Sequence, residues 1–113
     1  MHEMSLADNI MQLIEDAALE QQFTQVITVW LEIGQLACVE KESLRFYFDV
    51  VTQDSIARQA KLEIIEIPGQ ALCNQCNQDI WITAYHAACP HCGSYALHVT
   101  QGNEMRIKEI EVK

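Results

Sequence analysis

The sequence predicts an α+β fold in which two helices and a three-stranded sheet carry an inserted four-cysteine zinc-ribbon lobe. Two observations lead to this prediction. Apolar residues recur at helical spacing in two segments and alternate with polar residues, as in strands, in three others. Four cysteines stand as two Cys-x2-Cys pairs, twelve residues apart, before the last of the strand-like segments. The ribbon is therefore expected to interrupt the α+β lobe and to be followed by its final strand.

The first half of the α+β lobe is expected to be a helix followed by a strand. Apolar residues at helical spacing predict a helix from Ser5, as the N-cap, to about Gln21. Within it Met11 is expected to fill the core. From Thr24 to Ile33 the pattern changes to alternation of β-branched residues, which predicts a strand ended by Gly34.

The second half of this lobe repeats the same order. Leu44, Phe48 and neighbouring apolar residues predict a helix from about Glu42 to Thr52. Lys61–Ile67 is strand-like and is stopped by Pro68-Gly69. Short strand signals follow within the ribbon, and the last strand of the chain is predicted at its end. They lie at 80–82, 96–99 and 105–112.

These elements divide the chain into three parts. Residues 1–69 are expected to form the α+β lobe, 70–101 the zinc ribbon, and 102–113 the strand that returns to the first lobe. The two linkers, Pro68–Gln70 and Gln101–Asn103, are then expected to lie side by side. A hinge and a rigid strut both remain open for this pair.

The four cysteines have the spacing of a structural zinc site. Cys73-x2-Cys76 and Cys89-x2-Cys92 can each point two thiolates at one centre, and together they make the tetrahedral sulfur shell that Zn²⁺ favours. Such a closed shell leaves no open coordination position, which predicts a structural role. A pair of disulfides is the alternative, but a redox site would need only one Cys-x2-Cys pair.

Five further side chains leave alternatives open. His86, His91 and His98 flank the cysteines and could replace one of them as a ligand, although exposed positions are favoured because four thiolates already complete the shell. Cys38 is expected to be a small buried hydrophobe rather than a ligand. Glu40 could turn its carboxylate toward the N-terminus, but a solvated loop position is the stronger expectation.

The charge of the chain argues against nucleic acid as a partner. Its 113 residues include 7 Lys and Arg against 16 Asp and Glu, a net charge of −9, and phosphates repel such a surface. A basic protein partner or a cationic cargo fits better. Five cysteines, four of them in metal spacing, favour a reducing compartment. Without a signal-like start or a long apolar run, we expect a cytoplasmic protein with no membrane segment.

The N-terminus offers a second set of metal donors. The free α-amine of Met1, the amide and imidazole nitrogens of His2 and a donor from Glu3 can surround one ion in a plane. Ni(II) and Cu(II) accept a planar nitrogen set, whereas tetrahedral Zn²⁺ does not need one. From these residues alone, a solvated terminus with no metal remains the stronger alternative.

The chain opens with Met1-His2-Glu3-Met4-Ser5 and later carries the four spaced cysteines, and Gly102-Asn103-Glu104-Met105-Arg106-Ile107 then leads into the last strand. These motifs in this order resemble the HypA/HybF family of nickel metallochaperones for hydrogenase maturation.

The resemblance covers essentially the whole chain and implies a carrier with two metals, not an enzyme. It implies Ni²⁺ as cargo on Met1, His2 and Glu3, and structural Zn²⁺ on the four cysteines. It also implies delivery, with a hydrogenase-maturation GTPase, to a [NiFe]-hydrogenase large-subunit precursor, and in some bacteria to urease-maturation proteins. A zinc-ribbon adaptor with an idle His2 is the alternative. The client hydrogenase, the fourth nickel ligand, communication between the two metals, and a monomeric or homodimeric state stay open.

Overall fold

The computed structural model describes residues 3–113, which divide into two compact units. The first unit comprises the described residues up to Leu31, residues 39–65 and residues 106–113. The second unit comprises residues 32–38 and 66–105. Segment 32–38, expected in the first lobe, groups with the second unit, where the N–H of Leu36 donates to the carbonyl of Gly102 at 2.7 Å.

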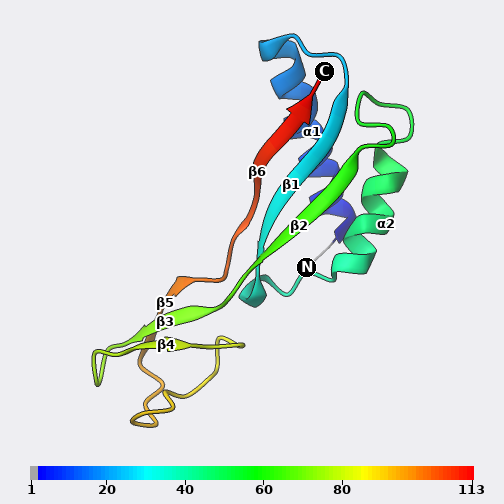
Figure 1. Ribbon diagram of the computed structural model, residues 1–113. Coiled ribbons are helices and arrows are strands. Elements are labelled where there is room, and N and C mark those ends of the chain that lie inside the picture. The colour runs from blue at the N-terminus through cyan, green and yellow to red at the C-terminus, as the bar shows by residue number, and fades with distance from the viewer. Residues whose placement is uncertain (1–2) are drawn as a thin grey trace. The chain divides into compact units, whose positions relative to one another are not determined.

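The first unit is built on a three-stranded sheet with the order β2-β1-β6. Central β1 (Val26–Gly34) lies between β2 (Lys61–Ile67) and β6 (Met105–Val112). Just after β6, the N–H of Lys113 donates to the carbonyl of Gln25, just before β1, at 2.8 Å, as expected for antiparallel neighbours. β1 and β2 run in the same direction in Figure 1, with helix α2 as the crossover between them. The predicted three-stranded sheet is therefore confirmed.

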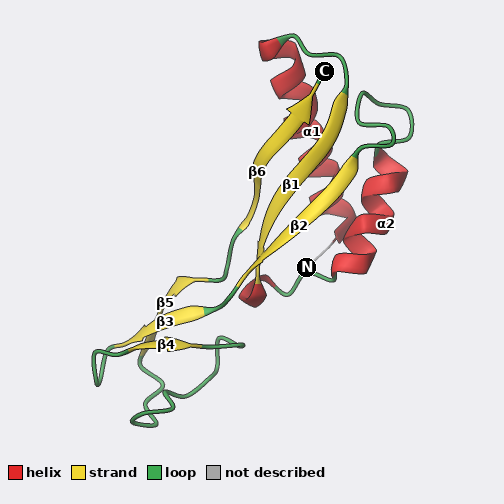
Figure 2. Ribbon diagram, viewed as in Figure 1, coloured by secondary structure: helices red, strands yellow, loops and turns green. Residues whose placement is uncertain are grey.

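Helices α1 (Glu3–Gln21) and α2 (Lys41–Val51) cover one face of this sheet, as Figure 2 shows. Met11 is buried on α1, as expected. The helix already includes Glu3, so the predicted N-cap at Ser5 is wrong. The apolar helix residues that face the core are Ala7, Ile10, Met11 and Ile14 on α1 and Leu44 and Phe48 on α2.

Both ends of α2 are capped by side chains. The carboxylate of Glu40 accepts the N–H of Glu42 at 3.3 Å, which satisfies one of the free donors of the first turn. At the other end the buried hydroxyl of Thr52 donates to the carbonyl of Phe48 at 2.7 Å. These caps account for where the helix predicted from the apolar spacing begins and ends.

The second unit contains a smaller antiparallel sheet with the order β4-β3-β5. Strands β4 (Asp79–Trp81) and β5 (Leu97–Gln101) match the short strand signals within about two residues, but central β3 (Gln70–Cys73) and the short 3-10 helix Gln35–Ala37 were not predicted. Four residues are too few to show an alternating pattern. The core of this unit consists of Leu36, Ala71, Cys73, Ile80, Ile82 and Cys89.

The two linkers lie side by side, as predicted. The side-chain amide of Gln101 donates to the carbonyl of Pro68 at 3.1 Å, and a Cβ on Gly102 would lie 2.5 Å from the Cα of Gly69. A third segment joins them, because a Cβ on Gly34 would lie 2.0 Å from the carbonyl oxygen of Gly102. Three segments of the second unit therefore touch backbone to backbone, and only glycines leave room for this.

We expect Gly34→Ala to destabilise the second unit by more than about 3 kcal/mol, the upper end for overpacking, because backbone atoms at 2.0 Å cannot move aside as side chains do. The matched control is Gly93→Ala. Gly93 has a φ of 75° but nothing within 4 Å of its added Cβ, so the expected cost is about 1–2 kcal/mol. Thermal unfolding followed by amide signals of this unit compares the two. Equal losses would show that the glycine contact is unimportant.

Candidate metal centre

The first Cys-x2-Cys pair lies in the turn that leaves β3. The N–H of Cys73 donates to the carbonyl of Gln78 at 2.9 Å, and the N–H of Asn77 donates back to Cys73 at 2.8 Å. Asn77 adopts a left-handed conformation with a φ of 59°, which asparagine tolerates better than most residues. These hydrogen bonds close a tight turn in which Cys73 and Cys76 both contribute sulfur atoms to the same cluster.

The second pair repeats the same hydrogen bonds. The N–H of Cys89 donates to Ser94 at 2.8 Å, and the N–H of Gly93 donates to Cys89 at 2.8 Å. Gly93 takes the left-handed place with a φ of 75°. In each turn the N–H of the first cysteine donates to the carbonyl of the residue five positions later. The N–H of the residue four positions later donates to the carbonyl of that cysteine. This shared pattern shows that the backbone shapes both turns.

The two turns bring the four sulfur atoms together. The Sγ atoms of Cys73 and Cys92 are 3.6 Å apart, those of Cys76 and Cys89 are 3.8 Å apart, and all four lie within 4.8 Å of one another. A tetrahedral zinc ion with Zn–S bonds of about 2.3 Å requires sulfur atoms about 3.8 Å apart. Disulfide sulfur atoms would be about 2.05 Å apart. The arrangement therefore suits zinc and not a pair of disulfides.

Electrostatics in this cluster also favour a cation. The backbone N–H of Cys76 lowers the pKa of Cys73 to about 7, whereas desolvation raises the pKa of Cys76 to about 12. For Cys92 a backbone N–H from Ser94 lowers the pKa, but burial and the sulfurs of Cys73 and Cys89 outweigh it and the net pKa is raised. Four neighbouring thiols cannot all ionise to thiolates without a nearby positive charge.

The second unit has no lysine or arginine to supply that charge. Residues 32–38 and 66–105, which make up the second unit, contain neither residue type. They do contain Glu32, Glu66, Asp79 and Glu104. A divalent metal ion would supply the charge that the polypeptide of this unit lacks, and binding would require the thiols to release their protons.

The remaining candidates near the cysteines do not join them. His86, His91 and His98 are exposed, and among residues 3–113 the four cysteines alone form a group of three or more potential metal ligands. Cys38 is exposed, so its expected burial is wrong. It follows the short 3-10 helix with a left-handed φ of 56°, and its thiol lies 3.6 Å from the carbonyl of Leu36.

The N-terminal donor set is only partly covered by the structure. Met1 and His2 lie outside the described residues, whereas Glu3 begins α1. The Oε2 atom of Glu3 is buried and has no hydrogen-bond partner among residues 3–113. A buried carboxylate oxygen without a partner is costly unless a cation or donor satisfies it. Glu40 uses its carboxylate to cap α2.

Comparison with known proteins identifies the family. A family model described as "Hydrogenase/urease nickel incorporation, metallochaperone, hypA" matches residues 1–112. The chain belongs to the HypA family. Two hydrogenase maturation factors HypA, from Azotobacter chroococcum mcd 1 and Azotobacter vinelandii, are 57% and 55% identical to it, and each alignment covers 100% of both chains.

The HypA fold is also recognised in three dimensions. The solution structure of the Ni metallochaperone HypA from Helicobacter pylori matches with a TM-score of 0.72 and 27% identity, covering 99% of this chain and 97% of that one. The predicted α+β fold with a four-cysteine cluster is therefore confirmed, and the protein belongs to a family of nickel-incorporation metallochaperones for hydrogenase maturation. Within residues 3–113, none of the helices has the length and apolar character needed to cross a membrane.

Proposed function

We propose that this HypA-family protein carries Ni²⁺ on its N-terminal segment while the four cysteines hold Zn²⁺ permanently. The ligands proposed for nickel are Met1, His2 and Glu3. Those proposed for zinc are Cys73, Cys76, Cys89 and Cys92. The observation that carries the nickel assignment is the buried Oε2 atom of Glu3, which has no hydrogen-bond partner within residues 3–113, directly after His2 in a chain whose family handles nickel.

The zinc assignment rests on the shape and charge of the cysteine cluster. Sulfur separations of 3.6 and 3.8 Å fit a four-thiolate shell, and two of its members, Cys73 and Cys89, belong to the core of the second unit. An ion held this way has no open coordination position. Zinc in this site would act as a structural element and would not be transferred.

The nickel assignment rests on the donors near Glu3. The N–H groups in the first turn of a helix have no partner within the helix, so the amide nitrogen of Glu3 is available in addition to its carboxylate. The amine and imidazole nitrogens of the two preceding residues complete a set that suits Ni(II). A chelate confined to a chain end can be dismantled by moving a few residues, which suits a carrier that must release its cargo.

The delivery step concerns the proteins that would receive the nickel. The family handles nickel for hydrogenase, so the proposed recipient is a [NiFe]-hydrogenase large-subunit precursor, reached together with a hydrogenase-maturation GTPase. Urease-maturation proteins are a further proposed partner, because the family description includes urease. The net charge of −9 supports basic surfaces on these partners.

Replacing His2 with alanine tests the carrier function. We expect nickel affinity to fall by at least about 100-fold, because loss of a ligand should cost no less than loss of an outer-shell partner. Zinc content should not change. Titration calorimetry on zinc-loaded protein measures the affinity, and nickel-dependent hydrogenase activity in cells measures the function.

The matched control is His86→Ala, which removes an exposed histidine from the second unit. It should leave nickel affinity unchanged. If His2→Ala binds nickel normally and supports hydrogenase maturation, the protein acts as a zinc-ribbon adaptor and the terminal nickel site is wrong. Glu3→Gln distinguishes the two possible donors of Glu3. Nickel affinity should fall if the carboxylate is the ligand and stay unchanged if the backbone amide nitrogen is.

A further inference from the structure

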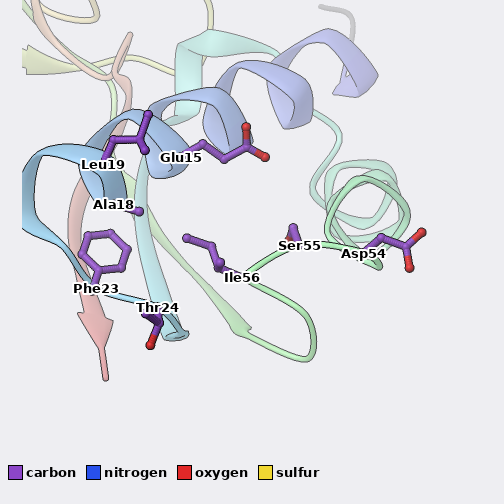
Figure 3. A pocket seen from close by; sticks show the side chains of 8 residues that line it. All are labelled: Glu15, Ala18, Leu19, Phe23, Thr24, Asp54, Ser55 and Ile56. Carbon is purple, nitrogen blue, oxygen red and sulfur yellow. The ribbon is translucent and has the colours of Figure 1, made fainter.

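The first unit has an open pocket beside the C-terminal half of α1. Its volume is about 690 Å³, and it lies between that half of the helix, the turn after it and the loop after α2 (Figure 3). The nickel and zinc assignments use none of the residues that line it. These residues are Glu15, Ala18, Leu19, Phe23, Thr24, Asp54, Ser55 and Ile56.

Apolar side chains form part of the pocket wall. Ala18, Phe23 and Ile56 face a common space in Figure 3. Leu19 contributes to the same pocket and is 83% exposed. An exposed leucine next to an apolar hollow leaves surface in water that a bound side chain could cover.

Acidic side chains flank this apolar surface. Glu15 lines the pocket from α1 and Asp54 lines it from the loop after α2. Asp16 and Glu20 lie on the same half of the helix, and its last turn has no basic residue. Acidic residues near a helix C-terminus oppose the helix dipole, so this distribution costs helix stability. Local features that cost stability are expected at functional sites.

Positive charges are close to the pocket but do not line it. Arg58 lines two adjoining hollows, one of them together with Asp54. Lys113 hydrogen-bonds through its backbone to Thr24 and Gln25. The sequence has no lysine or arginine before Lys41. The ionisable side chains that line the pocket are therefore both acidic.

We propose that this pocket docks a basic amphipathic helix of a partner protein. An apolar side chain of that helix would occupy the space beside Phe23 and Ile56, and lysine or arginine residues next to it would face Glu15 and Asp54. A second copy of this chain is a poor occupant, because each copy has a net charge of −9. Nucleic acid is excluded by the same charge. The proposal uses none of the residues assigned to the two metals.

A synthetic helical peptide provides the probe. It carries two leucines four residues apart with lysines beside them, and the reference peptide has glutamate in place of every lysine. Each is added to zinc-loaded, ¹⁵N-labelled protein while amide signals are recorded. We expect the lysine peptide to shift the signals of residues 15–24 and 54–56, with an affinity that falls as salt increases. The glutamate peptide should cause no shifts.

Two leucines on α1 make a matched pair of variants. Leu19→Ala should weaken binding about fivefold or more, because it removes apolar contact in the pocket. Leu13→Ala should leave binding unchanged, because Leu13 is also exposed, at 57%, but does not line the pocket. Glu15→Gln and Asp54→Asn should each weaken binding about 1.5- to 5-fold, as exposed ion pairs do. Both leucines are exposed, so the fold should tolerate these changes.

Several results would overturn the docking proposal. They are the absence of shifts at about 1 mM lysine peptide, equal binding of the glutamate peptide, and equal losses for the two leucine variants. Self-association that Leu19→Ala abolishes would instead identify a second copy as the occupant. Nickel and zinc contents are measured on the same samples and should not change, so failure here leaves the carrier function intact.

Discussion

Replacing Cys73 with alanine should unfold the second unit and leave α1 and α2 of the first unit in place. Cys73 is fully buried in a core of six residues, two of which are cysteines of the cluster. The unit has 47 residues, 7 in segment 32–38 and 40 in segment 66–105, close to the size below which a domain usually needs a metal. A structural zinc ion contributes about 10–16 kcal/mol in comparable small sites. Losing one ligand therefore removes the largest single contribution to its stability.

The two units give separate signals in this experiment. Both α1 and α2 belong to the first unit, so far-ultraviolet circular dichroism reports mainly on that unit. Amide signals of Ile80 and Leu97 report on the second. We expect retained helicity together with loss of the second set of signals.

Cys38→Ala is the control for the zinc prediction. Cys38 is an exposed cysteine outside the four-sulfur cluster, so its replacement should preserve zinc content and both sets of signals. Chelation of zinc from the unmodified protein should reproduce the effect of Cys73→Ala. Loss of helicity in the Cys73 variant would contradict the prediction and show that the two units unfold as one.

Extending the chain before Met1 should abolish stoichiometric nickel binding and leave zinc in place. An extension converts the α-amine into an amide, and the planar donor set loses its terminal nitrogen. Because an α-amine has a pKa of about 8, its proton must be displaced at neutral pH. Nickel affinity of the unextended protein should therefore rise as the pH rises toward about 8, and this rise should disappear in the extended protein.

The control is the same extension placed after Lys113. It adds equal length and charge but leaves Met1 free, so nickel affinity should not change. Titration calorimetry and elemental analysis on zinc-loaded samples measure both metals. Unchanged nickel affinity in the N-terminally extended protein would refute the terminal chelate, whereas a loss of zinc in either protein would show that the extension disturbs the fold.

Local patterns in the sequence determined much of the fold. Strands Lys61–Ile67 and Met105–Val112 have the bounds that their apolar patterns predicted, and α2 differs by one residue at each end. Such elements are predictable because the spacing of their apolar residues along the sequence indicates a helix or a strand. The spacing of the cysteines likewise indicated four sulfur atoms around one centre, since a Cys-x2-Cys turn needs only neighbouring residues.

Features that depend on distant residues were not predictable in this way. Strand β3 is too short to show a period and exists because β4 and β5 pair with it on both sides. The contact of Gly34 with Gly102 joins residues far apart in the chain.

The sequence alone therefore determined which segments form the two α-helices and the strands of the larger sheet, and which four sulfur atoms form a cluster. Only the tertiary structure decided that Glu3 buries an oxygen with no partner among the described residues, that Cys38 is exposed, and that acidic and apolar side chains line one pocket. The physical reason is the distance along the sequence over which each feature is determined. Periodicity and tight turns depend on residues within a few positions of one another, whereas burial and close backbone contact depend on which segments the complete fold brings together.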